Sequence, residues 1–184
     1  MANSNITKKF MIQTVKEMMT KKNLDQIQVR EITQRCGINR NTFYYHFKDK
    51  YDILETIYKE ELLPQIAPLL TRADWVHSLA VLTDHMKSEQ AFYTHAMTGS
   101  GGISMADLLA DTYRRFLMEE SAQMPGAPDR HQRDMIVRFY CHAIMGMLGD
   151  WVRLGMKQDV REALEVIRTA VNKNIFKAED NRTD

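Results

Sequence analysis

Long apolar runs are missing from this chain, and cysteine is scarce. No stretch of about eighteen apolar residues occurs, so we expect no transmembrane helix. The opening residues, MANSNITKKF, lack the apolar segment of a secretory signal. Cys36 and Cys141 lie far apart within apolar helical patterns, which predicts buried thiols in a reducing compartment rather than a disulfide. Together these absences favour a cytoplasmic protein without a membrane partner.

Motifs for metal, nucleotide or covalent chemistry are also absent. The sequence contains no CxxC, HExxH, GxGxxG or Walker loop. His77, His85 and His142 stand alone, so we interpret them as polar residues rather than metal ligands. An enzyme would need a nucleophile–base pair or a metal-ligand set, and neither is found. We therefore expect no catalytic residue, no metal and no cofactor, and the sequence favours a binding protein.

The charge is divided unevenly along the chain. Residues 1–50 hold 10 Lys and Arg against 4 Asp and Glu, whereas residues 51–184 hold 15 against 20. Affinity for phosphate is therefore expected in the first fifty residues only. The alternative is an ordinary solvated basic face.

Residues 29–47, VREITQRCGINRNTFYYHF, predict two short helices that meet at a sharp turn. Apolar residues recur there at the spacing of one buried helical face. Gly37 suits a left-handed helix end, and Asn39 can cap a second helix. Phe43 and Phe47 then share an inward face. This is the helix-turn-helix arrangement, whose second helix enters the DNA major groove, although a plain helical hairpin would show the same periodicity.

A longer stretch, VREITQRCGINRNTFYYHFKDKYDIL, resembles the DNA-binding domain of the TetR family of bacterial regulators. That family shows a T-[LF]-Y-x-[HY]-F-x-[DNS]-K-x-x-L run after the glycine turn. The run here extends from Thr42 to Ile53, with Leu54 following. One departure is Gln28, where the family often has a Thr or Ser that caps the helix.

The exposed face of the second helix carries the expected DNA contacts. The fork of Arg40 can bond guanine O6 and N7, and Asn41 can pair with adenine. Lysines beside the groove would add salt-sensitive contacts with phosphate. The resemblance implies a homodimer on a palindromic operator, and we expect a repressor. The residues expected at double-stranded DNA are Arg30, Thr33, Asn39, Arg40, Asn41, Thr42, Tyr44, Tyr45, His46, Lys48 and Lys50.

No strand pattern appears, so we predict an all-α fold of about nine helices. Residues 1–50 would form a three-helix helix-turn-helix domain, and residues 51–184 a C-terminal helical bundle for ligand sensing and dimerisation. Breaks are expected at Gly99–Gly102 and at 124–128, and residues 178–184 should fray. The expected helices span residues 7–21, 29–36, 40–47, 49–62, 75–89, 90–97, 104–121, 130–154 and 159–176.

The helix predicted over 130–154 suggests an assembly. Small residues within its apolar stripe would let another helix approach closely, either in the same chain or in a second copy. The stretch FYCHAIMGMLGDWVRLG resembles a low-GC Gram-positive branch of the TetR family that includes regulators of dihydroxyacetone kinase operons. TetR proteins dimerise through their last two long helices, which favours the second copy. The expected interface comprises Phe139, Ala143, Gly146, Met147 and Trp151.

The family resemblance also implies a cavity for a small-molecule effector in the C-terminal domain. Aromatic and methionine residues at helical spacing are equally expected of an ordinary core, so both interpretations stay open. A further alternative is a helical protein-interaction adaptor, or an activator controlled by a protein partner. The effector and the operator are not identified by the sequence. The candidate pocket residues are Trp75, His77, Met86, Phe92, Tyr93, Met97, Tyr113, Phe116, Tyr140 and His142.

Overall fold

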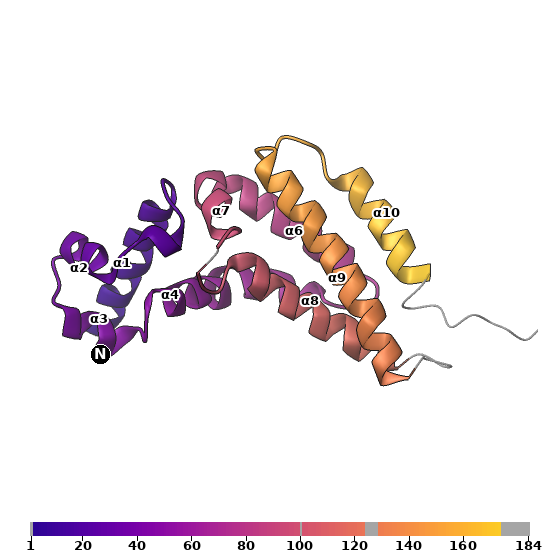
Figure 1. Cartoon of the computed structure of the whole chain (residues 1–184), viewed down its shortest axis with the longest axis horizontal. Helices are drawn as coiled ribbons and strands as arrows, with labels where there is room; N and C mark the ends of the chain where they lie inside the picture. The colour runs from indigo at the N-terminus through magenta and orange to yellow at the C-terminus, as the bar shows by residue number, and fades with distance from the viewer. Residues whose placement is uncertain (1, 100, 124–128, 174–184) are drawn as a thin grey trace, which may run out of the picture. The chain divides into compact units, whose positions relative to one another are not determined.

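The structure is a computed structural model that describes residues 2–99, 101–123 and 129–173 (Figure 1). Helices and their connections account for all of this part, and no strand occurs in it, so the predicted all-α fold is confirmed. None of the described helices is both long and apolar enough to cross a membrane. The α-helices are α1 (Ala2–Met19), α2 (Val29–Cys36), α3 (Arg40–His46), α4 (Lys50–Ile57), α5 (Leu63–Ile66), α6 (Trp75–Ser88), α7 (Gln90–Ala96), α8 (Met105–Ala122), α9 (Arg130–Arg153) and α10 (Arg161–Val171).

Some predicted features lie outside the described residues. These are Ser100 in the glycine-rich break, the loop at 124–128, the end of the last helix beyond residue 173 and the tail at 178–184.

The chain forms two compact units. The first contains residues up to 64 together with 86–108, and the second contains 65–85 together with the chain from 109 onward. Helix α6 contributes to both, because its last turn falls in the first unit. The predicted division of function between residues 1–50 and 51–184 stays a prediction.

The turn between α2 and α3 has the predicted geometry. Gly37 adopts φ 63° and ψ 28°, the left-handed conformation that ends helices, and the next amide donates to Thr33 O at 3.0 Å. The side chain of Asn39 caps α3 by accepting from the Thr42 amide at 2.8 Å. Phe43 and Phe47 are both buried, as their spacing predicts. Gln28 provides no side-chain cap to α2, as expected at this departure from the family pattern.

Helix α4 continues through a π-helical turn at Tyr58–Leu62 into α5. Asp49 caps its beginning by accepting from the amides of Tyr51 and Asp52. Pro64 lacks an amide hydrogen, and in a regular α-helix its ring would collide with the carbonyl of the residue four positions earlier. The wider π turn just before Pro64 relieves that collision and leaves the helix unbroken.

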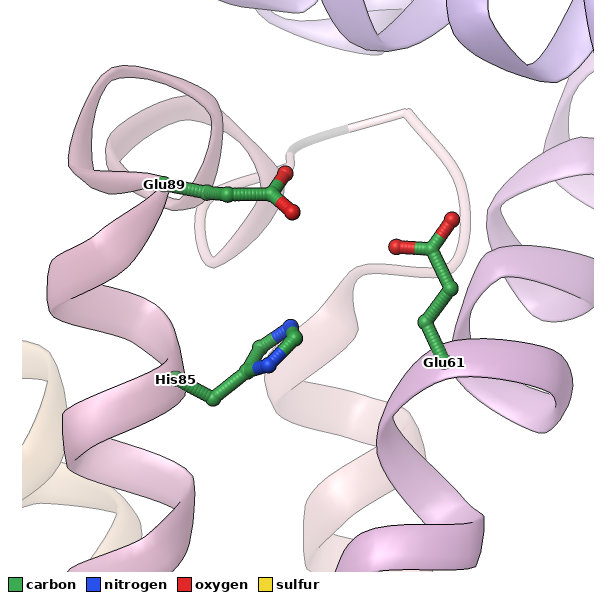
Figure 2. Close-up of side chains that lie close together, drawn as sticks. All are labelled: Glu61, His85 and Glu89. Carbon is green, nitrogen blue, oxygen red and sulfur yellow. The ribbon is translucent and has the colours of Figure 1, made fainter.

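Lys16 of α1 holds two other segments of the first unit. Its ammonium lies 2.5 Å from a carboxylate oxygen of Glu61 and 2.7 Å from one of Glu89, which immediately precedes α7. Figure 2 shows the carboxylates of Glu61 and Glu89 turned toward each other; His85, drawn with them, belongs to the second unit. Burial alone would lower the pKa of Lys16, but hydrogen bonds to the two carboxylates raise it above its usual value. Lys16 is therefore charged at neutral pH and joins α1, the π turn and α7.

The second unit is built on α6, α8, α9 and α10 (Figure 1). Trp75 and Tyr113 are fully buried, and the Tyr113 hydroxyl lies 2.7 Å from the Ser78 hydroxyl. Cys141 is buried in this core, and burial raises the pKa of its thiol to about 11. Cys36, half-buried in the first unit, also has a raised pKa because of burial. Both cysteines are free thiols that stay neutral at physiological pH.

Lys16→Met should destabilise the protein by about 1–3 kcal/mol, because two facing carboxylates lose their shared cation in a half-buried site. The side chain of Lys16 is only 11% exposed, so solvent screens this site less than a surface pair. Lys8→Met is the matched control, since Lys8 pairs with the exposed Glu60 at 2.7 Å. Denaturant unfolding should show the larger loss for Lys16→Met, and adding Glu89→Gln should recover part of it. Equal losses for the two lysine variants would contradict this assignment.

Candidate nucleic-acid interface and dimer face

Helix α3 presents a polar, aromatic face opposite its buried phenylalanines. Tyr44 is 46% and Tyr45 77% exposed, and Arg40 and Asn41 are also at the surface. The guanidinium of Arg40 lies over the Tyr44 ring, 5.6 Å from its centroid, and donates to the Tyr44 hydroxyl at 3.3 Å. These contacts orient Arg40 while its remaining donors stay at the surface. The face therefore combines a positioned cation with exposed hydrogen-bonding groups.

Of the ten Lys and Arg residues in residues 1–50, all except Lys50 fall into two groups. Lys8 and Lys16 bind carboxylates beyond residue 50, and Lys22 binds Glu31 at 2.6 Å. A second group lies exposed at the surface of this region and is available to phosphates. Its members are Lys9, Lys21, Arg30, Arg35, Arg40 and Lys48. The positive surface is therefore smaller than the sequence count alone suggests.

Lys50, predicted to contact DNA, makes three hydrogen bonds within the chain. Its ammonium donates to the carbonyls of Leu24, Asp25 and Ile27 at 2.8, 2.8 and 2.9 Å. These carbonyls belong to or follow the 3-10 turn at Leu24–Gln26. An ammonium has three donors, and here all three are used. Burial lowers the pKa of Lys50, partly opposed by the charge of Asp25. The structure thus gives Lys50 the role of fastening the loop after α1 to the start of α4.

Asp25 lies at the centre of a second set of contacts in the same unit. Its carboxylate accepts from the Tyr51 hydroxyl at 2.8 Å and from the Gly101 amide at 3.2 Å. A Cβ atom at Gly102 would come within 2.3 Å of the Tyr51 ring, so only glycine fits this close approach. Nearby, Asn23 Oδ1 lies 2.7 Å from His95 Nδ1 of α7. The loop after α1 is therefore fastened to α4, to α7 and to the loop that follows α7.

The other predicted DNA residues differ in their placement. Thr33 is buried, and its hydroxyl donates to the Arg30 carbonyl at 3.0 Å, so it does not share the exposed face. Asn39 and Thr42 are bonded to each other in the cap of α3. His46 is half-buried, whereas Arg30 and Lys48 are exposed. The structure therefore gathers Arg40, Asn41, Tyr44 and Tyr45 on α3, with Arg30 and Lys48 on adjoining segments.

Helix α9, the longest helix in Figure 1, carries an exposed apolar face. Phe139 is 69% and Met135 59% exposed, and Ala143, Gly146 and Met147 are also at the surface. A Cβ added to Gly146 would meet nothing within 4 Å, so no contact within the described chain requires glycine there. The predicted interface residues Phe139, Ala143, Gly146 and Met147 thus share one face.

Trp151, the fifth predicted interface residue, lies elsewhere on α9. It is only 4% exposed, and its indole nitrogen donates to the Gln158 carbonyl at 3.0 Å. At about 100° per residue, Trp151 is rotated roughly 120° around the helix axis from Phe139. It therefore belongs to the interior side of α9.

The candidate effector-pocket residues are mostly core. Trp75, Met86, Phe92, Tyr93, Met97, Tyr113 and Phe116 are buried. Tyr140 is half-buried, while His77 and His142 are exposed. All ten are described, and they are divided between the two units. Their role in binding an effector stays a prediction.

Comparison with known proteins decides the family. A profile described as "Transcriptional regulator C-terminal region" matches residues 73–173, more than half of the chain. A second, described as "Bacterial regulatory proteins, tetR family", matches residues 12–57, which include α2 and α3. The chain belongs to the TetR family. The family named from the helix-turn-helix residues is confirmed, and the protein is a TetR-family transcriptional regulator.

One curated protein and two solved structures are similar to this chain. A curated relative, the "HTH-type dhaKLM operon transcriptional activator DhaS" of Lactococcus lactis subsp. lactis (strain IL1403), is 29% identical over 93 residues. The matched part spans about half of each of these two chains. The structure of a "Dihydroxyacetone kinase operon activator DhaS" aligns with a TM-score of 0.62 and 19% identity, covering 93% of this chain and 97% of that one. NalD of Pseudomonas aeruginosa, "the secondary repressor of MexAB-OprM multidrug efflux pump", aligns with a TM-score of 0.56 and 16% identity, covering 94% and 97%. The structural likenesses show the fold.

Sequence reasoning did not find the internal roles of Lys50, Asp25 and Gly102. Lys50 bonds carbonyls more than twenty residues earlier, and Gly102 meets Tyr51 about fifty residues away. Helical periodicity carries no information about such distant contacts. A signal was available in Gly101–Gly102, because two adjacent glycines mark a position where backbone can approach closely.

Lys50→Met should lower stability, whereas Lys48→Ala should change DNA binding and leave stability nearly unchanged. Lys50→Met removes the donor from three carbonyls, so unfolding should show a loss of about 1.5–3 kcal/mol. Lys48 is exposed, so Lys48→Ala should change stability by less than about 0.5 kcal/mol. Lys48→Ala should instead reduce the salt dependence of DNA binding by about one phosphate contact. A Lys50→Met variant with unchanged stability and a reduced salt slope would overturn the structural role of Lys50.

Proposed function

We propose that the protein is a homodimeric regulator that places α3 of each subunit in the major groove of a palindromic DNA operator. The observation that carries this proposal is the face of Arg40, Asn41, Tyr44 and Tyr45 above the buried Phe43. Arg40 bonds guanine through its fork, and Asn41 pairs with adenine. The exposed Arg30 and Lys48 contact phosphates, which fix the register of the protein on the duplex.

A second copy supplies the cover for the exposed face of α9. An apolar face with small residues at its centre is what a two-fold helical interface requires. Glycine inside a helix costs about 1 kcal/mol relative to alanine, yet nothing in the described chain occupies the space beside Gly146. A facing helix from a second copy accounts for that space. The dimer also sets the separation of the two reading helices.

Repression is the direction of regulation that we propose first, with the dimer leaving its operator when an effector binds the C-terminal region. Activation through a protein partner is the second candidate. It is favoured by the similarity to the DhaS chains, both of which are named activators, whereas NalD is named a repressor. A reporter gene behind the bound promoter separates the two, because deletion of the regulator raises expression in the first case and lowers it in the second. In either case the protein acts in the cytoplasm, where the DNA is.

Arg40→Ala tests the reading of bases. The variant should lose about 1–3 kcal/mol of affinity for the operator and should discriminate less between bases at one position of each half-site. Its affinity for scrambled DNA should fall much less. Lys48→Ala is the matched control, because the loss of a phosphate contact weakens all sequences alike. Gel-shift titrations at fixed salt measure both. Equal losses of Arg40→Ala on operator and scrambled DNA would remove Arg40 as a reader of sequence.

Gly146→Leu tests the dimer face. Within one chain a Cβ atom at this position meets nothing within 4 Å, and leucine has a higher helix propensity than glycine, so the subunit should remain folded. Against a facing helix it should prevent close approach. Light scattering should give about 21.5 kDa for the variant and twice that mass for the wild type. Glu119→Leu, which adds a leucine to an exposed position of α8, should leave the dimer intact. A monomeric wild-type protein at micromolar concentration would contradict the proposal.

A further inference from the structure

Helices α6, α9 and α10 line an apolar cavity within the second unit that is partly open to solvent. Its volume is about 310 Å³, near the lower end of the range of small-molecule sites. Leu79 and Thr83 of α6, Ile144 and Trp151 of α9, and Leu164 and Ile167 of α10 line it. At roughly 30 Å³ for each water-sized group, the space suits about ten non-hydrogen atoms. None of the ten candidate effector-pocket residues, all of which are described, is among its lining residues.

Apart from the side-chain amide of Gln158, which can donate as well as accept, the polar side chains of the lining residues offer mainly acceptors. The indole N–H of Trp151 donates to the Gln158 carbonyl at 3.0 Å, and the Thr83 hydroxyl donates to the Ala80 carbonyl at 2.9 Å. Neither donor is therefore available to a ligand. The Thr83 oxygen keeps a lone pair, and Asp150 and Asp159 are among the lining residues. A ligand that donates a hydrogen bond would satisfy these acceptors.

The charges of the lining groups disfavour an anion. The described lining residues include two aspartates and no Lys, Arg or His. Asp150 pairs with Arg153, and the guanidinium of Arg161 lies 4.0 Å from Asp159, so the aspartates are partly neutralised. The Asp159 carboxylate accepts from the Arg161 amide through one oxygen, which leaves further acceptor sites. A ligand with an apolar body and one head group that donates a hydrogen bond matches this apolar lining and its acceptors.

We propose that this cavity binds a small apolar amine or alcohol. The hydrocarbon part lies between Leu79, Ile144 and Leu164, and the head group donates to Thr83 or Asp159. An occupant here touches α6, whose last turn belongs to the first unit and leads to Glu89, the partner of Lys16. The effect of the ligand on DNA binding rests on the proposed function, whereas binding of the ligand in the cavity does not.

Three probes of equal chain length separate the candidate head groups: octylamine, 1-octanol and octanoate. The chain has two tryptophans, so Trp75→Phe leaves Trp151 in the cavity wall as the only fluorescent indole. Titration of this full-length variant should change Trp151 emission with octylamine and octanol. Isothermal titration of the wild-type protein provides a second measurement, which does not depend on the tryptophan variant. Octanoate should bind at least ten-fold more weakly than either.

Ala163→Phe places a large ring into the cavity and should weaken octylamine and octanol at least ten-fold. Ala170→Phe is the matched control, because it makes the same change two turns later in α10, outside the lining, and should bind as the wild type does. Failure of all three probes to bind the dimeric wild type would overturn the proposal. Octanoate binding as tightly as octylamine would overturn the choice of head group. No DNA is present in these titrations, so they stand or fall independently of operator binding.

Discussion

The contact on which the first unit most depends is the sharing of one half-buried ammonium, that of Lys16, by two carboxylates. Lys16 on α1 binds Glu61 after α4 and Glu89 before α7, at sequence separations of 45 and 73 residues. A charge removed from water must be paired to be tolerated, so these three residues hold one another in place. The recognition helix α3 packs on α2, and α2 packs on α1. The position of the α3 face that is proposed to read DNA therefore follows from how α1 is held.

Further contacts fasten the loop after α1, and they involve the segment at 86–108 as well as α4. Lys50 and Tyr51 bind this loop from α4, while His95 and the amide of Gly101 bind it from α7 and from the loop after α7. The segment at 86–108 is thus part of the unit that carries the helix-turn-helix. It is also the continuation of α6, which lines the cavity of the second unit. A ligand bound in this cavity, as proposed above, would be connected through the chain of α6 to Glu89, and through the ion pair of Glu89 with Lys16 to α1. Any resulting shift in DNA affinity would equal the ligand's differential affinity for the two states.

Local features of the DNA-binding head could be predicted because they depend on neighbouring residues. Gly37 after an apolar helical face predicts the left-handed turn, Asn39 predicts the cap, and the spacing of Phe43 and Phe47 predicts the buried stripe. The role of Lys50 could not be predicted, because its charge suits a phosphate as well as a cluster of distant carbonyls. In α9, apolar residues occur on two faces, so helical periodicity alone placed Trp151 and Phe139 in one predicted interface. Trp151 is buried, whereas Phe139 is exposed. The cavity needs residues from three helices at once, which no local pattern contains.

Selection of DNA from a random pool by the full-length protein tests the central claim most directly. A dimer that reads the major groove with α3 should enrich sequences made of two inverted half-sites, with centres one helical turn of about 10 base pairs, or a multiple of it, apart. Enrichment should weaken steeply as salt is raised, because phosphate contacts supply much of the affinity. Recovery of two-fold symmetric sites at one fixed spacing is the predicted result. Recovery of unenriched DNA, or of single half-sites without symmetry, would contradict the account of a dimer that reads its operator through α3.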